Sequence, residues 1–158
     1  MSHVASIDLD VKDLNALKKA CADLGLEFME GQTTHKWYGK WVNDYNADDA
    51  AYKQGVATED YGKCVHALKV KDTPGAYEVG VIKNPNGKGF KLIWDFYAGG
   101  QGLMSVIGTD GKKLIGAYAE HATKRAMKKQ GLQVKMKTLK DGTRRITGTA
   151  PIKLGQKK

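Results

Sequence analysis

The chain has 158 residues, a length that suits one compact domain. Hydrophobic residues make up 41% and charged residues 27%, which is typical of a globular protein and argues against disorder. No apolar run approaches the length of a membrane-spanning helix. The first ten residues lack the features of a signal peptide, and two cysteines do not build a disulfide framework. We therefore expect a cytoplasmic protein with no membrane partner.

Charge is distributed unevenly along the chain. Residues 1–60 hold six lysines and eleven acidic residues, a net charge of −5, whereas residues 61–158 hold twenty basic and six acidic residues, a net charge of +14. A basic surface attracts anions such as nucleic acid or nucleotides. Lysine also makes proteins soluble, and it outnumbers arginine, the better bidentate phosphate ligand, by 23 to 3. Both interpretations stay open.

The first predicted elements are a strand, a helix and two more strands. Polar and apolar residues alternate over Val4–Val11, which indicates a strand. Asp13 is expected to cap a helix that Gly25 ends. Its apolar stripe consists of Leu14, Leu17, Cys21 and Leu24. Strands are predicted next over Leu26–Glu30 and over residues 35–42.

Residues 43–63 are polar, acidic and without clear periodicity, so we expect a long surface insertion. Asp44, Asn46 and Asp48 resemble the start of a calcium loop. However, Asp49 and Gly55 occupy the positions where such a loop needs Gly and Glu. The sequence therefore predicts no calcium site here.

The second half is predicted to contain strands over residues 65–71, 76–83 and 90–97, followed by a flexible glycine-rich connection over 99–102. A helix over 112–130 is expected to be capped by Thr109 or Asp110 and ended by Gly131. A hairpin over 132–149 turns at Asp141-Gly142. This order predicts an α+β fold with a mainly antiparallel sheet and two helices packed on one face. Residues 1–150 form the single domain, and 151–158 are a basic tail.

The faces of the second helix differ. Its inward stripe is predicted to contain Leu114, Ile115, Tyr118, Ala119, Ala122 and Ala126. Helical spacing places Lys113, Lys124 and Lys128 near one sector of the outer face. In the last hairpin, Arg144 and Arg145 alternate, so only one of them can lie on a given face.

No catalytic residue, cofactor or metal site is predicted. Cys64 and His66 would share a strand face, but a metal needs three or four ligands and the sequence offers no matching pair. The glycines near Lys88 lack the spacing of a phosphate loop. His121 stands without an evident orienting partner, so an enzymatic function has no acid–base pair to support it.

Candidate binding residues are basic or aromatic. The candidate anion-binding residues are Lys83, Lys88, Lys91, Lys112, Lys113, Lys124, Arg125, Lys128, Arg144 and Arg145. Trp37, Tyr38 and Trp41 lie between lysines, and such residues either stack on nucleotide bases or pack into the core. Lys135 and Lys137 either belong to a ligand site or protect a strand edge from unwanted pairing, and both interpretations stay open.

Short motifs along the chain carry a resemblance to a known family. They include Asp13-Leu14-x-x-Leu17, Tyr77-Glu78-Val79-Gly80, Trp94-Asp95-Phe96-Tyr97, Tyr118-Ala119-Glu120-His121 and Lys129-Gln130-Gly131-Leu132-Gln133-Val134. With them, nearly the whole chain resembles the hypothetical chloroplast reading-frame thirty-five family of plastids, cyanobacteria, other bacteria and bacteriophages. The resemblance implies a single α+β domain, with Tyr118 and His121 in the most specific motif, and no established activity. The lysine-rich composition is similar to that of phage proteins.

These observations predict a phage-encoded, non-enzymatic protein that binds nucleic acid or a nucleotide-like anion. Three alternatives remain open at this point. The chain could sequester a nucleotide messenger of host defence, block a host protein, or serve as a component of a virion or its assembly.

Overall fold

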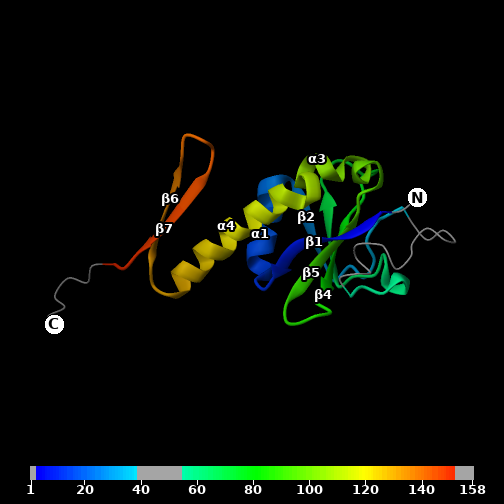
Figure 1. The fold of residues 1–158 in the computed structure, drawn as a ribbon, viewed down its shortest axis with the longest axis horizontal. Coiled ribbons are helices and arrows are strands. Elements are labelled where there is room, and N and C mark those ends of the chain that lie inside the picture. The colour runs from blue at the N-terminus through cyan, green and yellow to red at the C-terminus, as the bar shows by residue number, and fades with distance from the viewer. Residues whose placement is uncertain (1–2, 39–54, 152–158) are drawn as a thin grey trace.

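The structure, a computed structural model, describes residues 3–38 and 55–151. Its centre is a five-stranded antiparallel sheet in the spatial order β1-β5-β4-β3-β2. The strands are β1 (Val4–Val11), β2 (Leu26–Glu30), β3 (His66–Val70), β4 (Val79–Lys83) and β5 (Phe90–Asp95). Helices pack on the sheet, so the predicted α+β class is confirmed (Figure 1).

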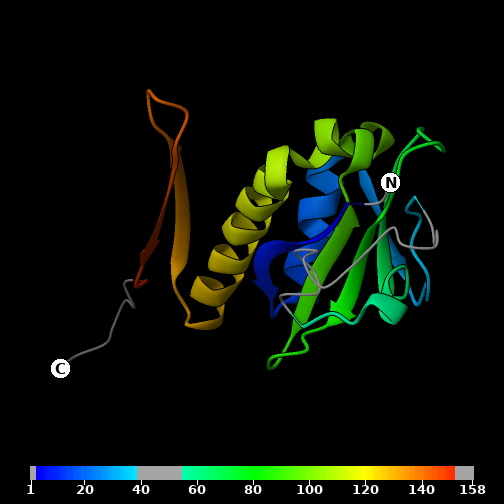
Figure 2. The ribbon, with the colours of Figure 1, turned by 45° about the vertical axis from the view of Figure 1, so that its right-hand side comes forward.

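Helices α1 (Leu14–Leu24), α3 (Leu103–Ile107) and α4 (Lys112–Lys129) contribute to the same core. Leu17 of α1, Leu103 of α3 and Leu114 of α4 are fully buried against apolar side chains of the sheet. Figures 1 and 2 show α1 and the first half of α4 side by side over the sheet. The second half of α4 continues beyond the sheet.

The ends of α1 agree with the prediction. The Asp13 carboxylate accepts hydrogen bonds from the backbone N–H groups of Asn15 and Ala16 at 3.0 and 3.2 Å. Gly25 ends the helix in the left-handed conformation, with φ of 75°, which glycine adopts without steric cost.

The glycine-rich connection before α3 is a packed turn, so the prediction of a flexible linker is wrong. It forms a 3₁₀ turn, Tyr97–Gly102, in which four successive residues from Ala98 to Gln101 have positive φ. Gly100 is buried, and a Cβ there would lie 3.3 Å from the Trp94 ring. The glycines supply backbone conformation and close approach rather than mobility.

The start of α4 also differs from the prediction. Neither Thr109 nor Asp110 caps it; both lie in a 3₁₀ turn, and Gly111 precedes the helix without a side-chain cap. Ala119 and Ala126 are exposed although the predicted stripe contained them. Ala119 instead lines a hollow that α4 shares with Arg144 and Ile146 of the hairpin, and it lies at the edge of the stripe that Leu114 and Tyr118 bury.

One predicted strand is absent from its described residues, and the strand predicted over 76–83 begins later than expected. Residues 35–38 form no strand; Thr34 makes only an isolated bridge with Lys63, and residues 39–42 lie outside the described part. The strand predicted from residue 76 begins at Val79, because the Ala76 N–H closes a turn onto Thr73 and the Tyr77 N–H bonds Gly100.

The described end of the predicted insertion is partly buried. Val56 and Tyr61 pack with Val4 and Ile93 on the sheet face opposite the helices. Val56 and Tyr61 therefore belong to the core, whereas Gly55, Glu59, Asp60 and Lys63 are exposed as expected of a surface insertion. The calcium-like residues Asp44, Asn46 and Asp48 lie outside the described residues.

The C-terminal hairpin forms a sheet of its own. Strands β6 (Gln133–Thr138) and β7 (Arg144–Thr149) pair around the predicted Asp141-Gly142 turn. Both views show the hairpin at the end of α4, away from the five-stranded sheet (Figures 1 and 2). The basic tail from residue 152 lies outside the described part.

Candidate anion-binding surfaces

Positive charge is concentrated in α4 and the hairpin. Residues 112–151 contain eleven Lys or Arg and two acidic residues, a net charge of +9. Residues 1–111 contain twelve Lys and fifteen acidic residues, a net charge of −3. Helix α4 and the hairpin therefore carry most of the positive charge of the sequence.

The hairpin has two chemically different faces, which its register defines. Residues that face each other across an antiparallel pair lie on the same side of the ribbon. The outer face consists of the pairs Gln133–Thr149, Lys135–Thr147 and Lys137–Arg145. All six of these residues are exposed. This outer face presents three cations and three hydrogen-bonding side chains, with no apolar and no acidic side chain.

The inner face of the hairpin is directed toward α4. It consists of the pairs Val134–Gly148, Met136–Ile146 and Thr138–Arg144. Arg144 Nη1 donates to both carboxylate oxygens of Glu120 on α4, at 2.9 and 2.7 Å. Gly148 lies so close to α4 that a Cβ there would be 3.1 Å from Met127 Sδ. The hairpin is thus attached to α4 at two levels, with Arg144 held on the inner face and Arg145 free to face solvent.

A basic cavity of about 450 Å³ lies between α1 and the second half of α4. Every side chain that lines it is a base: Lys19, His121, Lys124, Arg125, Lys128 and Lys129. Spacings of three and four residues place the α4 members on one side of that helix, and Lys19 approaches from α1. We call this hollow the interhelical cavity.

Three carboxylates orient three of the five α4 side chains that line the interhelical cavity. Arg125 Nε bonds Asp13 at 2.7 Å, Lys124 Nζ bonds Glu120 at 2.9 Å, and His121 Nε2 lies 2.6 Å from Asp23 Oδ2. Burial tends to raise the pKa of Glu120, but its bonds to Lys124 and Arg144 outweigh burial and lower it. Lys19, Lys128 and Lys129 make no ion pair within the described residues.

Tyr118 and His121, the residues of the family-like motif, lie where α4 meets α1. The Tyr118 hydroxyl accepts hydrogen bonds from the backbone N–H groups of Lys12 and Asp13. His121 bonds Asp23. The motif therefore joins the two helices.

Not all predicted basic residues contribute to one surface. Lys83 and Lys88 are exposed in and after β4, and Lys91 is paired with Asp10 at 3.0 Å. Lys112 and Lys113 lie at the start of α4. Eleven residues of helix, about 16 Å, separate Lys113 from Lys124 along the axis. The interhelical cavity includes Lys124, Arg125 and Lys128 and none of the other predicted positions.

Three basic contributors outside α4 were not among the predicted anion-binding residues. Lys19 belongs to α1, and nothing in local spacing shows that it meets α4. For Lys135 and Lys137, alternation with Val134 and Met136 indicated one basic face, but edge protection explained that face equally well. The position of the hairpin outside the body gives that face its accessibility.

The described aromatic candidates are engaged in packing. The Trp37 ring packs edge-on against Tyr61, and a Cβ at Gly62 would collide with it. The Tyr38 ring packs edge-on against Tyr97. These contacts favour the core alternative over a stacking platform. Trp41 lies outside the described residues.

Two polar side chains, Asp95 of β5 and His35, are buried beside the sheet. The Asp95 side chain is fully buried and accepts from the N–H groups of His3, Tyr38 and Tyr97. His35 is buried against Gly80; burial lowers its pKa, and its Nε2 has no hydrogen-bond partner among the described residues. The hydrogen bonds of Asp95 join the backbone at His3, Tyr38 and Tyr97 to the end of β5.

Burial makes the two thiols poor nucleophiles. Burial raises the pKa of Cys21 to about 12 and that of Cys64 to about 11, so both stay protonated near neutral pH. Cys64 precedes β3 and donates to Gln32 O, whereas His66 Nδ1 accepts from the Gly31 N–H. The two do not share a strand face as predicted, because the strand begins only at His66. Within residues 3–38 and 55–151, no three His, Cys, Asp or Glu side chains form a metal-binding group.

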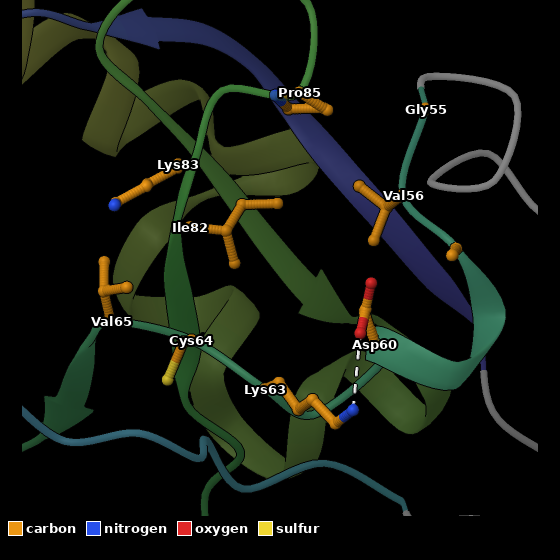
Figure 3. A pocket seen from close by; sticks show the side chains of 10 residues that line it. Gly55, Val56, Asp60, Lys63, Cys64, Val65, Ile82, Lys83 and Pro85 are labelled. Atoms are coloured by element: carbon orange, nitrogen blue, oxygen red, sulfur yellow. Dashed lines mark hydrogen bonds and ion pairs between the residues drawn. The ribbon is translucent and has the colours of Figure 1, made fainter.

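A second hollow, of about 320 Å³, lies near Cys64 on the sheet face opposite the helices. Figure 3 shows Val56 and Ile82 on its walls and the Asp60–Lys63 ion pair at its rim. Its lining is mostly apolar, and Lys83 is its one cation without an ion pair in the described part of the chain. It therefore does not concentrate positive charge as the interhelical cavity does.

None of the described helices has the length and apolar character needed to cross a membrane. Comparison with family models, curated proteins and solved structures finds no match for this chain.

Proposed function

We propose that this chain is a non-enzymatic nucleic-acid-binding protein that contacts its ligand with the outer face of the β6–β7 hairpin. One observation carries the proposal. Lys135, Lys137 and Arg145 lie on a single exposed face together with Gln133, Thr147 and Thr149.

The shape of the hairpin suits this role. A two-stranded ribbon fits the major groove of B-form DNA. Cations on such a ribbon contact phosphates and set affinity, while Gln and Thr side chains can hydrogen-bond to base edges. The hairpin lies outside the body and is attached to α4, so a nucleic acid can reach its outer face without touching the acidic N-terminal part.

The experiment measures binding of fluorescent single- and double-stranded oligonucleotides by anisotropy over a range of salt concentrations. The test variant replaces Lys135, Lys137 and Arg145 with Gln. The slope of log K against log salt should become shallower by about 0.7–0.9 for each phosphate that the variant no longer neutralises. A matched control replaces Lys83, Lys88 and Lys112 with Gln, which removes the same charge elsewhere, and its slope should stay near that of the wild type.

Two results would overturn the proposal. One is absence of oligonucleotide binding by the unmodified protein at low salt. The other is an equal loss of affinity in both variants, which would mean that total charge rather than the hairpin determines binding.

A further inference from the structure

We propose that the interhelical cavity is a binding site for a di- or triphosphate group, and that it is separate from the hairpin surface. Its volume of about 450 Å³ lies within the range of small-ligand sites, about 300–1,000 Å³. Unlike most such sites, it is lined by basic side chains alone. Its ligand must therefore be a compact, strongly anionic group.

The walls of the cavity are preorganised. The buried side chains of Leu17 on α1 and of Leu114 and Tyr118 on α4 belong to one core, which fixes the two helices relative to each other. Asp13 then holds the Arg125 guanidinium at 2.7 Å. A ligand does not have to order the helices before it binds, which removes part of the entropic cost of association.

The charge of the cavity is not balanced by its own carboxylates. Asp13 and Glu120 form ion pairs with Arg125 and Lys124, and Asp23 hydrogen-bonds His121. Lys19, Lys128 and Lys129 remain without an ion pair within the described residues. Like charges brought together by two packed helices repel one another, and an anion with three or four negative charges removes this repulsion. The surplus of three lysines matches the charge of a di- or triphosphate.

The residues that line the cavity also predict that it does not discriminate among nucleobases. It contains no aromatic ring other than that of His121 and no amide side chain, so a nucleobase would find little stacking surface and no hydrogen-bonding pattern. Affinity should therefore rise with the number of phosphates and vary little among adenine, guanine and cytosine nucleotides. The phosphate group can come from a free nucleotide or from the 5′ end of a triphosphorylated RNA.

The primary experiment is isothermal titration calorimetry with inorganic tripolyphosphate at low ionic strength and without divalent cations. Saturable binding of one tripolyphosphate per chain is expected. The test variant replaces Lys19, Lys128 and Lys129 with Gln. Each charge-assisted hydrogen bond contributes about 1.5–3 kcal/mol, roughly a factor of ten or more in affinity, so the variant should bind at least about 100-fold more weakly. A matched control replaces Lys135, Lys137 and Arg145 with Gln and should bind like the wild type.

Further titrations distinguish the ligand source and the two proposals. ATP and GTP are compared with a short RNA that carries either a 5′-triphosphate or a 5′-hydroxyl. If the 5′-triphosphate RNA binds more tightly than both the 5′-hydroxyl RNA and ATP, an RNA end is the source of the phosphate group. If it binds no more tightly than ATP, the source is the free nucleotide. These titrations use the variant in which Lys135, Lys137 and Arg145 are replaced by Gln, so that RNA binding through the hairpin does not contribute. Tripolyphosphate binding is measured without any oligonucleotide, so the hairpin proposal can fail while this one holds.

The site is disproved if tripolyphosphate gives no saturable binding, or if the cavity and hairpin variants lose affinity equally. Circular dichroism melting of both variants checks that the substitutions leave the fold intact. If the cavity variant unfolds, the single Lys19→Gln and Lys129→Gln variants, whose residues are exposed, replace it. Each should then bind about tenfold more weakly.

Discussion

Tyr118 on α4 provides the hydrogen-bond acceptor for the backbone of Asp13, the residue that caps α1. Its hydroxyl oxygen lies 3.1 Å from Asp13 N and 3.0 Å from Lys12 N, and the residue is 6% exposed. A hydrogen bond thus joins two residues that are 105 positions apart in the sequence. Asp13 in turn binds Arg125 of α4, so the start of α1 and the middle of α4 are joined at two points.

Removal of the Tyr118 hydroxyl should destabilise the protein. In Tyr118→Phe, two partly buried N–H groups lose their acceptor, which should cost about 1–3 kcal/mol of unfolding free energy. Urea denaturation measures the change. Tyr97→Phe is the control, since the Tyr97 hydroxyl makes no hydrogen bond within residues 3–38 and 55–151, and it should change stability by less than about 0.5 kcal/mol. Equal stability of the two variants would contradict this role of Tyr118.

Asp13 should make stability depend on pH in the acid range. Burial tends to raise the pKa of its carboxyl, but the bonds and charge of Arg125 and the N–H groups of Ala16 and Asn15 outweigh burial and lower it. A carboxyl with a lowered pKa stabilises the folded state fully above its unfolded pKa, which is about 3.9. That contribution is lost as the pH falls through the lower folded pKa.

The comparison with Asp13→Asn isolates this effect, because asparagine keeps the ability to cap a helix. The stability difference between wild type and variant should be constant from pH 7 to about pH 5 and should shrink below about pH 4. Urea denaturation at several pH values measures it. A difference that stays constant down to about pH 2 would show that the Asp13 charge contributes nothing.

Local chemistry made much of the fold predictable. The Asp13 cap, the Gly25 end of α1 and the Asp141-Gly142 turn follow from residue types that favour those backbone conformations, and the structure contains all three. The Gly99-Gly100 segment shows the limit of such inference. Glycine permits both a mobile linker and a left-handed packed turn, and the buried Trp94 ring beside Gly100 determines which of them forms.

The sequence pattern predicted some residues of the candidate sites but not the contacts between helices that complete them. Helical spacing placed Lys124 and Lys128 near one sector of α4, and strand alternation placed Arg144 and Arg145 on opposite faces. The spacing could not show that Lys19 completes the interhelical cavity. Nor could it show that Asp23, 98 residues away, binds His121. Such pairings depend on how α1 and α4 pack on the sheet, which the sequence pattern of either helix alone does not specify.

The Glu120–Arg144 pair should control how firmly the hairpin is held against α4. The Glu120 side chain is 14% exposed and receives two hydrogen bonds from Arg144, whereas the rest of the hairpin makes its close approach at Gly148. In Glu120→Gln the ion pair is removed while a polar side chain of similar size remains. Because Arg144 is 52% exposed, we expect a loss of about 0.5–1 kcal/mol.

This loss should be local to the hairpin. Hydrogen exchange of the β6 and β7 amides should become about two- to fivefold faster, while exchange in β4 and β5 should not change. Arg144→Gln should accelerate hairpin exchange to the same extent, and the double variant should add little in the hairpin because both substitutions break the Glu120–Arg144 contact. The Lys124–Glu120 pair, which Glu120→Gln also removes, lies within α4 and does not connect to the hairpin. Arg145→Gln, on the outer face, is the matched control and should leave exchange unaltered. Additive effects of Glu120→Gln and Arg144→Gln, or an equal effect of Arg145→Gln, would show that the pair does not hold the hairpin.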